Sequence, residues 1–133
     1  MSHFIQDIPA AFNPGITHPL YLIRSELYRA ISAHAPQMSG RMMDFGCGLK
    51  PYEGLFRVSE YIGVDYQAEG ETYEQGKVDV FYDGRTLPFP DNHFDSIFSS
   101  EVFEHIFNLP EIMDELHRVL RPGGVLQLAD VAL

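Results

Sequence analysis

Short apolar runs alternate with helix-like segments along most of this 133-residue chain, and this alternation limits the fold more than any other feature. Apolar residues at helical spacing predict helices over about 20–35 and about 108–121, with a short helix after Pro51. Apolar runs bounded by turn residues predict strands at 41–45, 61–65, 78–82, 94–99 and 125–128. Strands that alternate with helices are joined by right-handed crossovers, so the sequence predicts an α/β fold with a mainly parallel sheet.

The length and charge of the chain limit its number of domains and its classes of binding partner. Residues 1–18 are expected to form an irregular N-terminal arm, and residues 19–133 a single domain. Nine Lys and Arg against 19 Asp and Glu give a formal net charge of −10 without a basic cluster, so we expect no nucleic-acid partner. No apolar run approaches the ~20 residues that span a bilayer, so we expect no membrane insertion. A single cysteine, Cys47, and a start without a signal sequence favour the cytoplasm.

The turn after the first strand is a candidate binding site. Residues 44–48 (Asp-Phe-Gly-Cys-Gly) end this strand, and Asp65 ends the next one. Glycines at such a turn let a ligand approach the backbone closely, and Asp65 could accept two hydrogen bonds from a ribose diol. On these residues alone, a tight turn beside a solvated Asp65 explains the pattern equally well. A dinucleotide is disfavoured, because Pro51 stands where its fingerprint needs a third glycine.

A second group of motifs lies in the C-terminal half of the chain. Residues 83–89 (DGRTLPF), 91–100 (DNHFDSIFSS), 101–106 (EVFEHI) and 118–124 (RVLRPGG) follow one another in that order. Together with residues 44–48 and Asp65, they closely resemble the class I S-adenosylmethionine-dependent methyltransferases, in the branch that acts mostly on small molecules and on lipid or glycan precursors. The resemblance covers residues 41 to about 129, and its several ordered motifs make it far more specific than the glycine turn.

The resemblance implies S-adenosylmethionine as cofactor and S-adenosylhomocysteine as product. It assigns six residues to the methionine and sulfonium end of the cofactor: Asp44, Gly46, Cys47, Gly48, Ser99 and Ser100. The Asp44 carboxylate would balance the ammonium and sulfonium charges, and the two serines would lie at the strand end beneath the sulfonium. Many family members carry a third glycine where Lys50 stands, and Lys50 could instead pair with the cofactor's carboxylate.

Four further residues are assigned by the resemblance to the nucleoside end. Asp65 would accept hydrogen bonds from the ribose hydroxyls, and Tyr66 would pack against adenine. Asp83 would accept from the adenine amino group, while the Gly84 N–H would meet a ring nitrogen. The resemblance thus implies that the ends of two neighbouring strands form the nucleoside site.

The chemistry of methyl transfer asks for positioning and exclusion of water more than for covalent help from the protein. A base is needed only if the acceptor loses a proton, and His105 is the candidate, although a capping or packing role explains it better. No metal site is expected, because residues 101–105 lack the paired histidines of a zinc helix. Cys47 is better explained as a small packing residue than as a nucleophile.

The resemblance also implies the architecture: a Rossmann-like α/β fold with sheet order 3-2-1-4-5, helices on both faces and an extra N-terminal helix. Family members usually continue through two more strands, whereas this chain ends at Leu133. From the resemblance we expect methyl transfer to a small-molecule or glycan- or lipid-precursor acceptor. The early end of the chain leaves a truncated cofactor-binding module without turnover as the alternative. A homodimer could cover the edge of the fifth strand.

Overall fold

The computed structural model describes residues 21–67, 76–100 and 102–129. The expected N-terminal arm at 1–18 lies outside the described residues, as do residues 68–75 and Glu101. The main elements in chain order are α2 (Tyr21–His34), β1 (Arg41–Phe45), β2 (Glu60–Tyr66), β3 (Val80–Tyr82), β4 (Phe94–Ser100), α3 (Leu109–Val119) and β5 (Leu120–Ala129). Three single 3₁₀ turns lie between them: η1 (Ala35–Gln37), η2 (Glu53–Leu55) and η3 (Phe103–His105).

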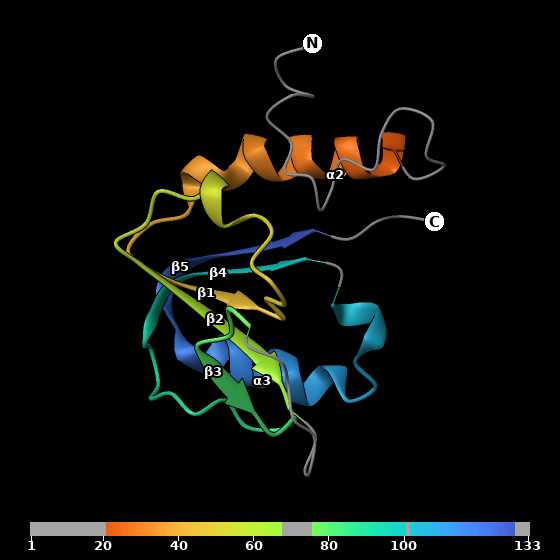
Figure 1. Cartoon of the computed structure of the whole chain (residues 1–133). Helices are drawn as coiled ribbons and strands as arrows, with labels where there is room; N and C mark the ends of the chain where they lie inside the picture. The colour runs from red at the N-terminus through yellow and green to blue at the C-terminus, as the bar shows by residue number, and fades with distance from the viewer. Residues whose placement is uncertain (1–20, 68–75, 101, 130–133) are drawn as a thin grey trace.

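The five strands form one parallel sheet in the order β3-β2-β1-β4-β5, which confirms the predicted order. Because every strand runs the same way, the carboxyl ends of β1, β4 and β5 point to one edge of the sheet (Figure 1). Ligands of open α/β sheets bind at this edge, near the place where the strand order reverses. Here β1 is that place, because it pairs with β2 on one side and with β4 on the other.

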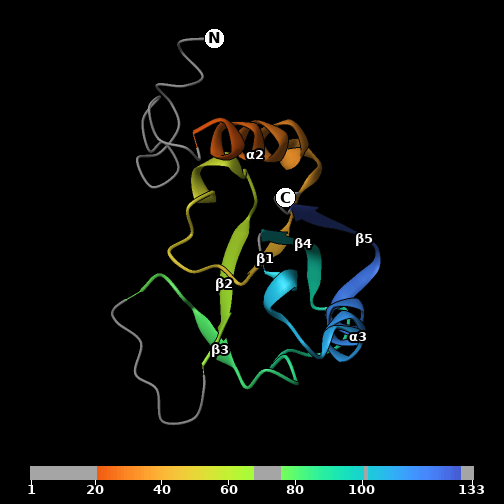
Figure 2. The same cartoon turned by 90° about the vertical axis from the view of Figure 1, so that its right-hand side faces the viewer.

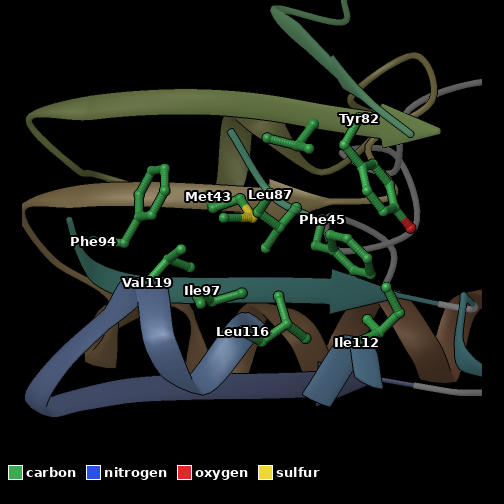
Figure 3. Close-up of a cluster of buried hydrophobic side chains, with 10 residues drawn as sticks. Met43, Phe45, Tyr82, Leu87, Phe94, Ile97, Ile112, Leu116 and Val119 are labelled. Atoms are coloured by element: carbon green, nitrogen blue, oxygen red, sulfur yellow. The ribbon is translucent and has the colours of Figure 1, made fainter. Parts of the chain in front are cut away.

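Helices cover both faces of the sheet, as predicted (Figure 2). Successive side chains of a strand point to opposite faces, and Met42 and Met43 of β1 do so here. Met42 packs in one buried cluster with Ile31 of α2. Met43 packs in a second cluster with Ile112 and Leu116 of α3, shown in Figure 3. Burial on both faces explains why the strand sequences read as continuous apolar runs.

The end of α3 differs from the sequence prediction. The helix ends at Val119 and the backbone is already extended at Leu120, two residues before the expected stop. Leu120 pairs with Phe94 of β4, and the register shift that follows absorbs the turn before the regular pairing begins. Arg121 therefore lies outside the helix that it was expected to end, and its Nε instead donates to Asp95 Oδ1 at 2.7 Å. The short helix expected after Pro51 is a single 3₁₀ turn.

The loop between β3 and β4 is fastened to α3. Arg118 donates from its guanidinium to the carbonyl oxygens of Leu87 and Phe89, at 2.9 and 2.8 Å. The same guanidinium is ion-paired with Glu115 at 2.7 Å and with Asp91 at 3.0 Å. These bonds hold the loop that follows Asp83 in place through contacts within the protein alone.

Candidate functional site

A pocket of about 640 Å³ opens at the carboxyl edge of the sheet. Its walls come from the ends of β1, β2 and β3, from the segment after β4 and from the first turn of α3: Phe45, Gly46, Asp65, Tyr66, Tyr82, Asp83, Gly84, Arg85, Val102, His105, Ile106, Phe107, Asn108 and Glu111. Five of the ten predicted cofactor residues line it: Gly46, Asp65, Tyr66, Asp83 and Gly84.

The turn after β1 is built around the backbone of Gly46. The N–H groups of Gly46 and Cys47 both donate to Val64 O, at 2.7 and 3.1 Å, so the chain reverses tightly against β2. Gly46 has φ +74, and a Cβ there would lie 2.2 Å from a methyl carbon of Val102. Only glycine fits this position without strain and a clash.

Asp65, at the end of β2, is held by two backbone donors. Its Oδ2 accepts the Gly48 N–H at 3.0 Å, and its Oδ1 accepts the Tyr66 N–H at 2.8 Å. The first bond joins the β2 end to the β1 turn, which are 17 residues apart in the chain. Each carboxylate oxygen keeps a further lone pair, so Asp65 can still accept hydrogen bonds from a ligand.

Asp83 and Gly84 form the corresponding corner after β3. Asp83 Oδ1 accepts the N–H groups of Arg85 and Thr86, both at 2.8 Å. These bonds, that of Thr86 most strongly, hold the pKa of Asp83 below its usual range, so the group is ionised at neutral pH. Gly84 has φ +89, and a Cβ there would lie 3.0 Å from a ring carbon of Tyr66.

Aromatic rings make one side of the pocket. The Tyr82 ring lies 5.4 Å from the ring of Phe45 and 6.1 Å from that of Tyr66, centroid to centroid. Burial raises the pKa of Tyr82 to about 12, so its hydroxyl stays protonated at neutral pH. Phe107, at the pocket rim, is 98% exposed. The site therefore combines carboxylates with flat apolar surface, which suits a neutral base carried on a sugar.

Asp44 lies away from the pocket lining. Its side chain is 3% exposed and accepts a hydrogen bond from the Tyr61 hydroxyl at 2.5 Å. Burial raises the pKa of Asp44 to about 7. The hydrogen bond from Tyr61 and the charge of Lys50 lower this pKa, whereas the charges of Asp65 and Glu53 raise it further. Burial also raises the pKa of Tyr61, so its phenol remains the donor.

Lys50 forms an ion pair with a carboxylate of the protein itself. Its side chain is only 8% exposed, and its Nζ lies 2.6 Å from Asp79 Oδ2. Asp79 also accepts the Gly63 N–H at 2.7 Å. Partial burial opposes ionisation of Asp79, but the bonds from Lys50 and Gly63 hold its pKa below the usual range. Lys50 thus links the segment before β3 to the β1 turn. The residues around Asp79 give no sequence signal from which this ion pair could be predicted.

The remaining predicted residues surround the turn without lining the pocket. Cys47 is buried, and burial raises the pKa of its thiol to about 12, so the thiol is protonated at neutral pH. Its role in packing stays a prediction. Ser99 is 2% exposed and donates to Phe45 O at 2.9 Å, so it braces β4 against β1. Ser100 Oγ is buried and has no hydrogen-bond partner among the residues that the structure describes. Gly48 is exposed, and nothing lies near the position where a Cβ would stand.

His105, the candidate base, lies in the pocket wall on η3 and is exposed. Sequence reasoning missed two other residues of this wall, Asn108 and Glu111. Asn108 Nδ2 donates to Gly84 O at 3.0 Å and to Glu111 Oε2 at 3.3 Å. Asn108 was expected only to open the helix, and its contact with a residue 24 positions earlier has no signal in the local sequence.

In residues 21–67, 76–100 and 102–129, no three His, Cys, Asp or Glu side chains gather in a way that could hold a metal ion. Within the same residues, no helix has both the length and the apolar character needed to cross a membrane.

The chain is similar in sequence to known methyltransferases. Residues 43–128 match a family model described as a methyltransferase domain. A fatty-acid O-methyltransferase of Mycolicibacterium smegmatis is 30% identical over 115 residues, which cover 79% of this chain and 42% of that protein. A malonyl-[acyl-carrier protein] O-methyltransferase of Pectobacterium atrosepticum is 32% identical over 104 residues, which cover 73% and 41%.

The solved structures give the same picture. The crystal structure of the YcgJ protein from Bacillus subtilis superposes with a TM-score of 0.62 at 27% identity, covering 79% of this chain and 50% of that one. The chain spans about half the length, or somewhat less, of these three proteins.

Proposed function

The chain belongs to the class I S-adenosylmethionine-dependent methyltransferases, and on this premise we propose that its pocket binds S-adenosylmethionine and S-adenosylhomocysteine. The observation that carries the proposal is the pair of backbone-anchored carboxylates, Asp65 and Asp83, at the ends of neighbouring strands. A nucleoside presents hydroxyl and amino donors at two separated points, and two fixed acceptors beside an aromatic surface suit that pattern.

We assign the ribose to Asp65. Both of its oxygens are already oriented by backbone N–H groups, so little conformational entropy is lost when a diol binds. Hydrogen bonds to a charged acceptor are worth roughly 1.5–3 kcal/mol each. Tyr66, the next residue, would then lie against the base, because its ring covers Gly84.

The adenine is assigned to the corner after β3. Asp83 would accept from the amino group, and the Gly84 N–H would donate to a ring nitrogen. Asp83 is ionised and its Oδ1 is fixed by its own turn, which supports a role as a preset acceptor. The glycine at position 84 lets the Tyr66 ring lie close to the backbone, where a side chain would crowd it.

The methionine end is assigned to the β1 turn and the end of β4. Gly46 lines the pocket and Gly48 faces open space, so these two residues of the group can touch a ligand. Ser100 Oγ is buried and has no hydrogen-bond partner among the described residues, so it would act from beneath the sulfonium. The other three, Asp44, Cys47 and Ser99, support the turn from behind. Asp44 would act on the positive end of the cofactor through its charge and through the position of the turn.

The proposed reaction is methyl transfer to a small-molecule or glycan- or lipid-precursor acceptor. The bound cofactor supplies a methyl group activated by a positively charged sulfur. The residues of the chain hold the cofactor, align its methyl group with the acceptor and keep water out, and these effects supply most of the acceleration. The two curated relatives described above are O-methyltransferases, which supports an oxygen acceptor. His105 would accept a proton only if the acceptor must lose one.

Calorimetry with S-adenosylhomocysteine tests the binding proposal. We expect the parent protein to bind, and Asp65→Asn to weaken binding by about 10–100-fold, the equivalent of ~1.4–2.8 kcal/mol. The matched control is Glu60→Gln, an exposed carboxylate on the same strand that pairs with Arg41 far from the pocket. Failure of the parent to bind, or equal losses in both variants, would contradict the proposal.

Turnover is tested separately from binding. Transfer of a labelled methyl group from S-adenosylmethionine to long-chain fatty acids and to a cell extract would show an active enzyme. Binding without transfer to any acceptor would favour the cofactor-binding module without turnover.

A cytoplasmic location belongs to the same proposal, because Cys47 is a free thiol.

A further inference from the structure

The side chain of Asn108 does not do what its position in α3 predicts. Asn108 is the N-cap of the helix, where Asn is preferred because its side-chain oxygen accepts an N–H of the first turn. Here the side chain makes no cap hydrogen bond. Its amide points to the pocket wall instead, where Nδ2 donates to Gly84 O at 3.0 Å. Asn108 thus lacks the capping bond that would stabilise its own helix and instead makes a bond to a distant residue. Exceptions of this kind to local sequence rules are expected at functional sites.

The orientation of this amide is required by its neighbours. Nδ2 faces Gly84 O and Glu111 Oε2, at 3.0 and 3.3 Å, and both are acceptors. Only the NH₂ group of Asn108 can satisfy them, so the amide cannot be turned over without losing both bonds. Glu111 therefore fixes Asn108 in the donor orientation towards Gly84.

One peptide group links Asn108 to the carboxylate of Asp83. The carbonyl of Gly84 accepts from Asn108, and the N–H of the same peptide, which belongs to Arg85, donates to Asp83 Oδ1 at 2.8 Å. A hydrogen bond at one end of a peptide polarises the group and strengthens the bond at the other end. Asn108 thus acts on the orientation of Asp83 through the Gly84–Arg85 peptide.

The rest of the loop is held independently of Asn108. Arg118 fastens Leu87 and Phe89 to the last turn of α3, at 2.9 and 2.8 Å. Loss of the Asn108 amide should therefore leave the loop in place and change mainly the orientation of the Gly84–Arg85 peptide. Because the two sets of bonds are separate, the effect of Asn108 on this peptide can be measured without loss of the loop.

We infer that Asn108 is a positioning residue for the base end of the pocket: by holding the Gly84–Arg85 peptide, it orients the Asp83 carboxylate that reads the amino group of the base. The inference rests on the proposed function, because it assumes that Asp83 accepts from adenine. It goes further by assigning base selectivity to a helix residue that need not touch the base.

The test compares two ligands that differ only in the base. S-adenosylhomocysteine carries the amino group, and S-inosylhomocysteine carries an oxygen in its place. The variants are Asn108→Ala, which removes the donor, and Asn108→Asp, which keeps the shape but turns an acceptor towards Gly84 O. The matched control is Asn92→Asp, the same chemical change at an exposed residue of the β3–β4 loop.

The readout is the ratio of the two dissociation constants, which does not depend on the fraction of folded protein. We expect the parent protein and Asn92→Asp to prefer the amino ligand by about tenfold or more. The preference should fall about three- to tenfold in Asn108→Ala and further in Asn108→Asp. Thermal unfolding of each variant is measured alongside to confirm that it is folded.

The outcomes separate this inference from the proposed function. If the parent protein binds S-adenosylhomocysteine and the Asn108 variants lose affinity for both ligands equally, Asn108 only supports the pocket and the inference is overturned. An unchanged ratio with unchanged affinity overturns it as well. A parent protein that binds neither ligand overturns the proposed function, and the inference falls with it.

Discussion

At the residue scale, Asp44 is a carboxyl group that the fold keeps almost entirely out of water. Its pKa is raised to about 7 by burial, against an ordinary value of 3.8. Because the folded pKa is the higher one, the folded state binds an extra proton between about pH 4 and pH 7. Stability from this group is fully present below that window and is lost as the pH rises through about 7.

Asp44→Asn should remove this dependence. The amide keeps the size of the side chain and can still accept from Tyr61, but it carries no charge to bury. We expect its free energy of unfolding to exceed that of the parent by about 2–4 kcal/mol at pH 8, and to differ little near pH 4. Urea unfolding across this pH range measures the effect.

The control for this measurement is Glu60→Gln, an exposed carboxylate on β2 whose loss should leave the pH profile unchanged. A parent protein whose stability stays flat from pH 4 to pH 8, apart from effects shared with the control, would show that Asp44 ionises without cost. The ligand assay on the same variant tests separately whether the charge of Asp44 acts on the positive end of the cofactor.

At the scale of the element, the β1 turn depends on its first glycine more than on its second. Gly46 combines φ +74 with a missing Cβ that would press on Val102, whereas Gly48 has φ +51 and open space. We expect Gly46→Ala to cost about 2–4 kcal/mol of stability and Gly48→Ala about 1 kcal/mol, since only the first adds a clash to the backbone strain. Denaturant unfolding of the two variants gives the difference.

A second substitution separates the two causes at Gly46. Val102→Ala in the Gly46→Ala background removes the methyl group that lies 2.2 Å from the added Cβ. Recovery of part of the lost stability would identify the clash, and the remainder would be the cost of positive φ. Equal losses in Gly46→Ala and Gly48→Ala would argue against a close contact with Val102.

At the scale of the whole molecule, the two edges of the sheet are β3 and β5. Among the residues that the structure describes, β5 pairs with β4 alone, and Leu128 on it is 45% exposed. An open edge strand of ten residues is a template for pairing with another chain. We therefore retain the prediction that a second copy covers this edge.

Sedimentation measures this prediction directly. The parent protein should associate as its concentration rises, and Leu128→Lys should weaken the association, because a charge beside the edge opposes strand pairing. A lysine at exposed Leu49, on the β1 turn, serves as the control. A protein that stays monomeric over the whole range, or that responds equally to both substitutions, would count against the β5 edge.

Much of the architecture could be predicted because its causes are local. The strands and helices follow from apolar periodicity, and Met42 and Met43 pack on opposite faces because a strand alternates its side chains. The end of α3 was misplaced because Leu120 pairs with Phe94, 26 residues away, and a pairing of this kind leaves no mark on the sequence around it.

The sequence by itself determined the strands and helices along the chain, the glycine turn at Gly46 and the two acids, Asp65 and Asp83, that follow strands. These follow from periodicity and turn chemistry, which act within short stretches of chain, whereas the order of the strands in the sheet was implied by the family resemblance. The tertiary structure alone decided which groups face one another. It placed Asp44 against Tyr61, because the register of β1 and β2 puts both on one face, and it brought Asn108 to Gly84 across the pocket. Register and packing set these contacts, because they depend on the position of the whole sheet and not on the residues next to each group.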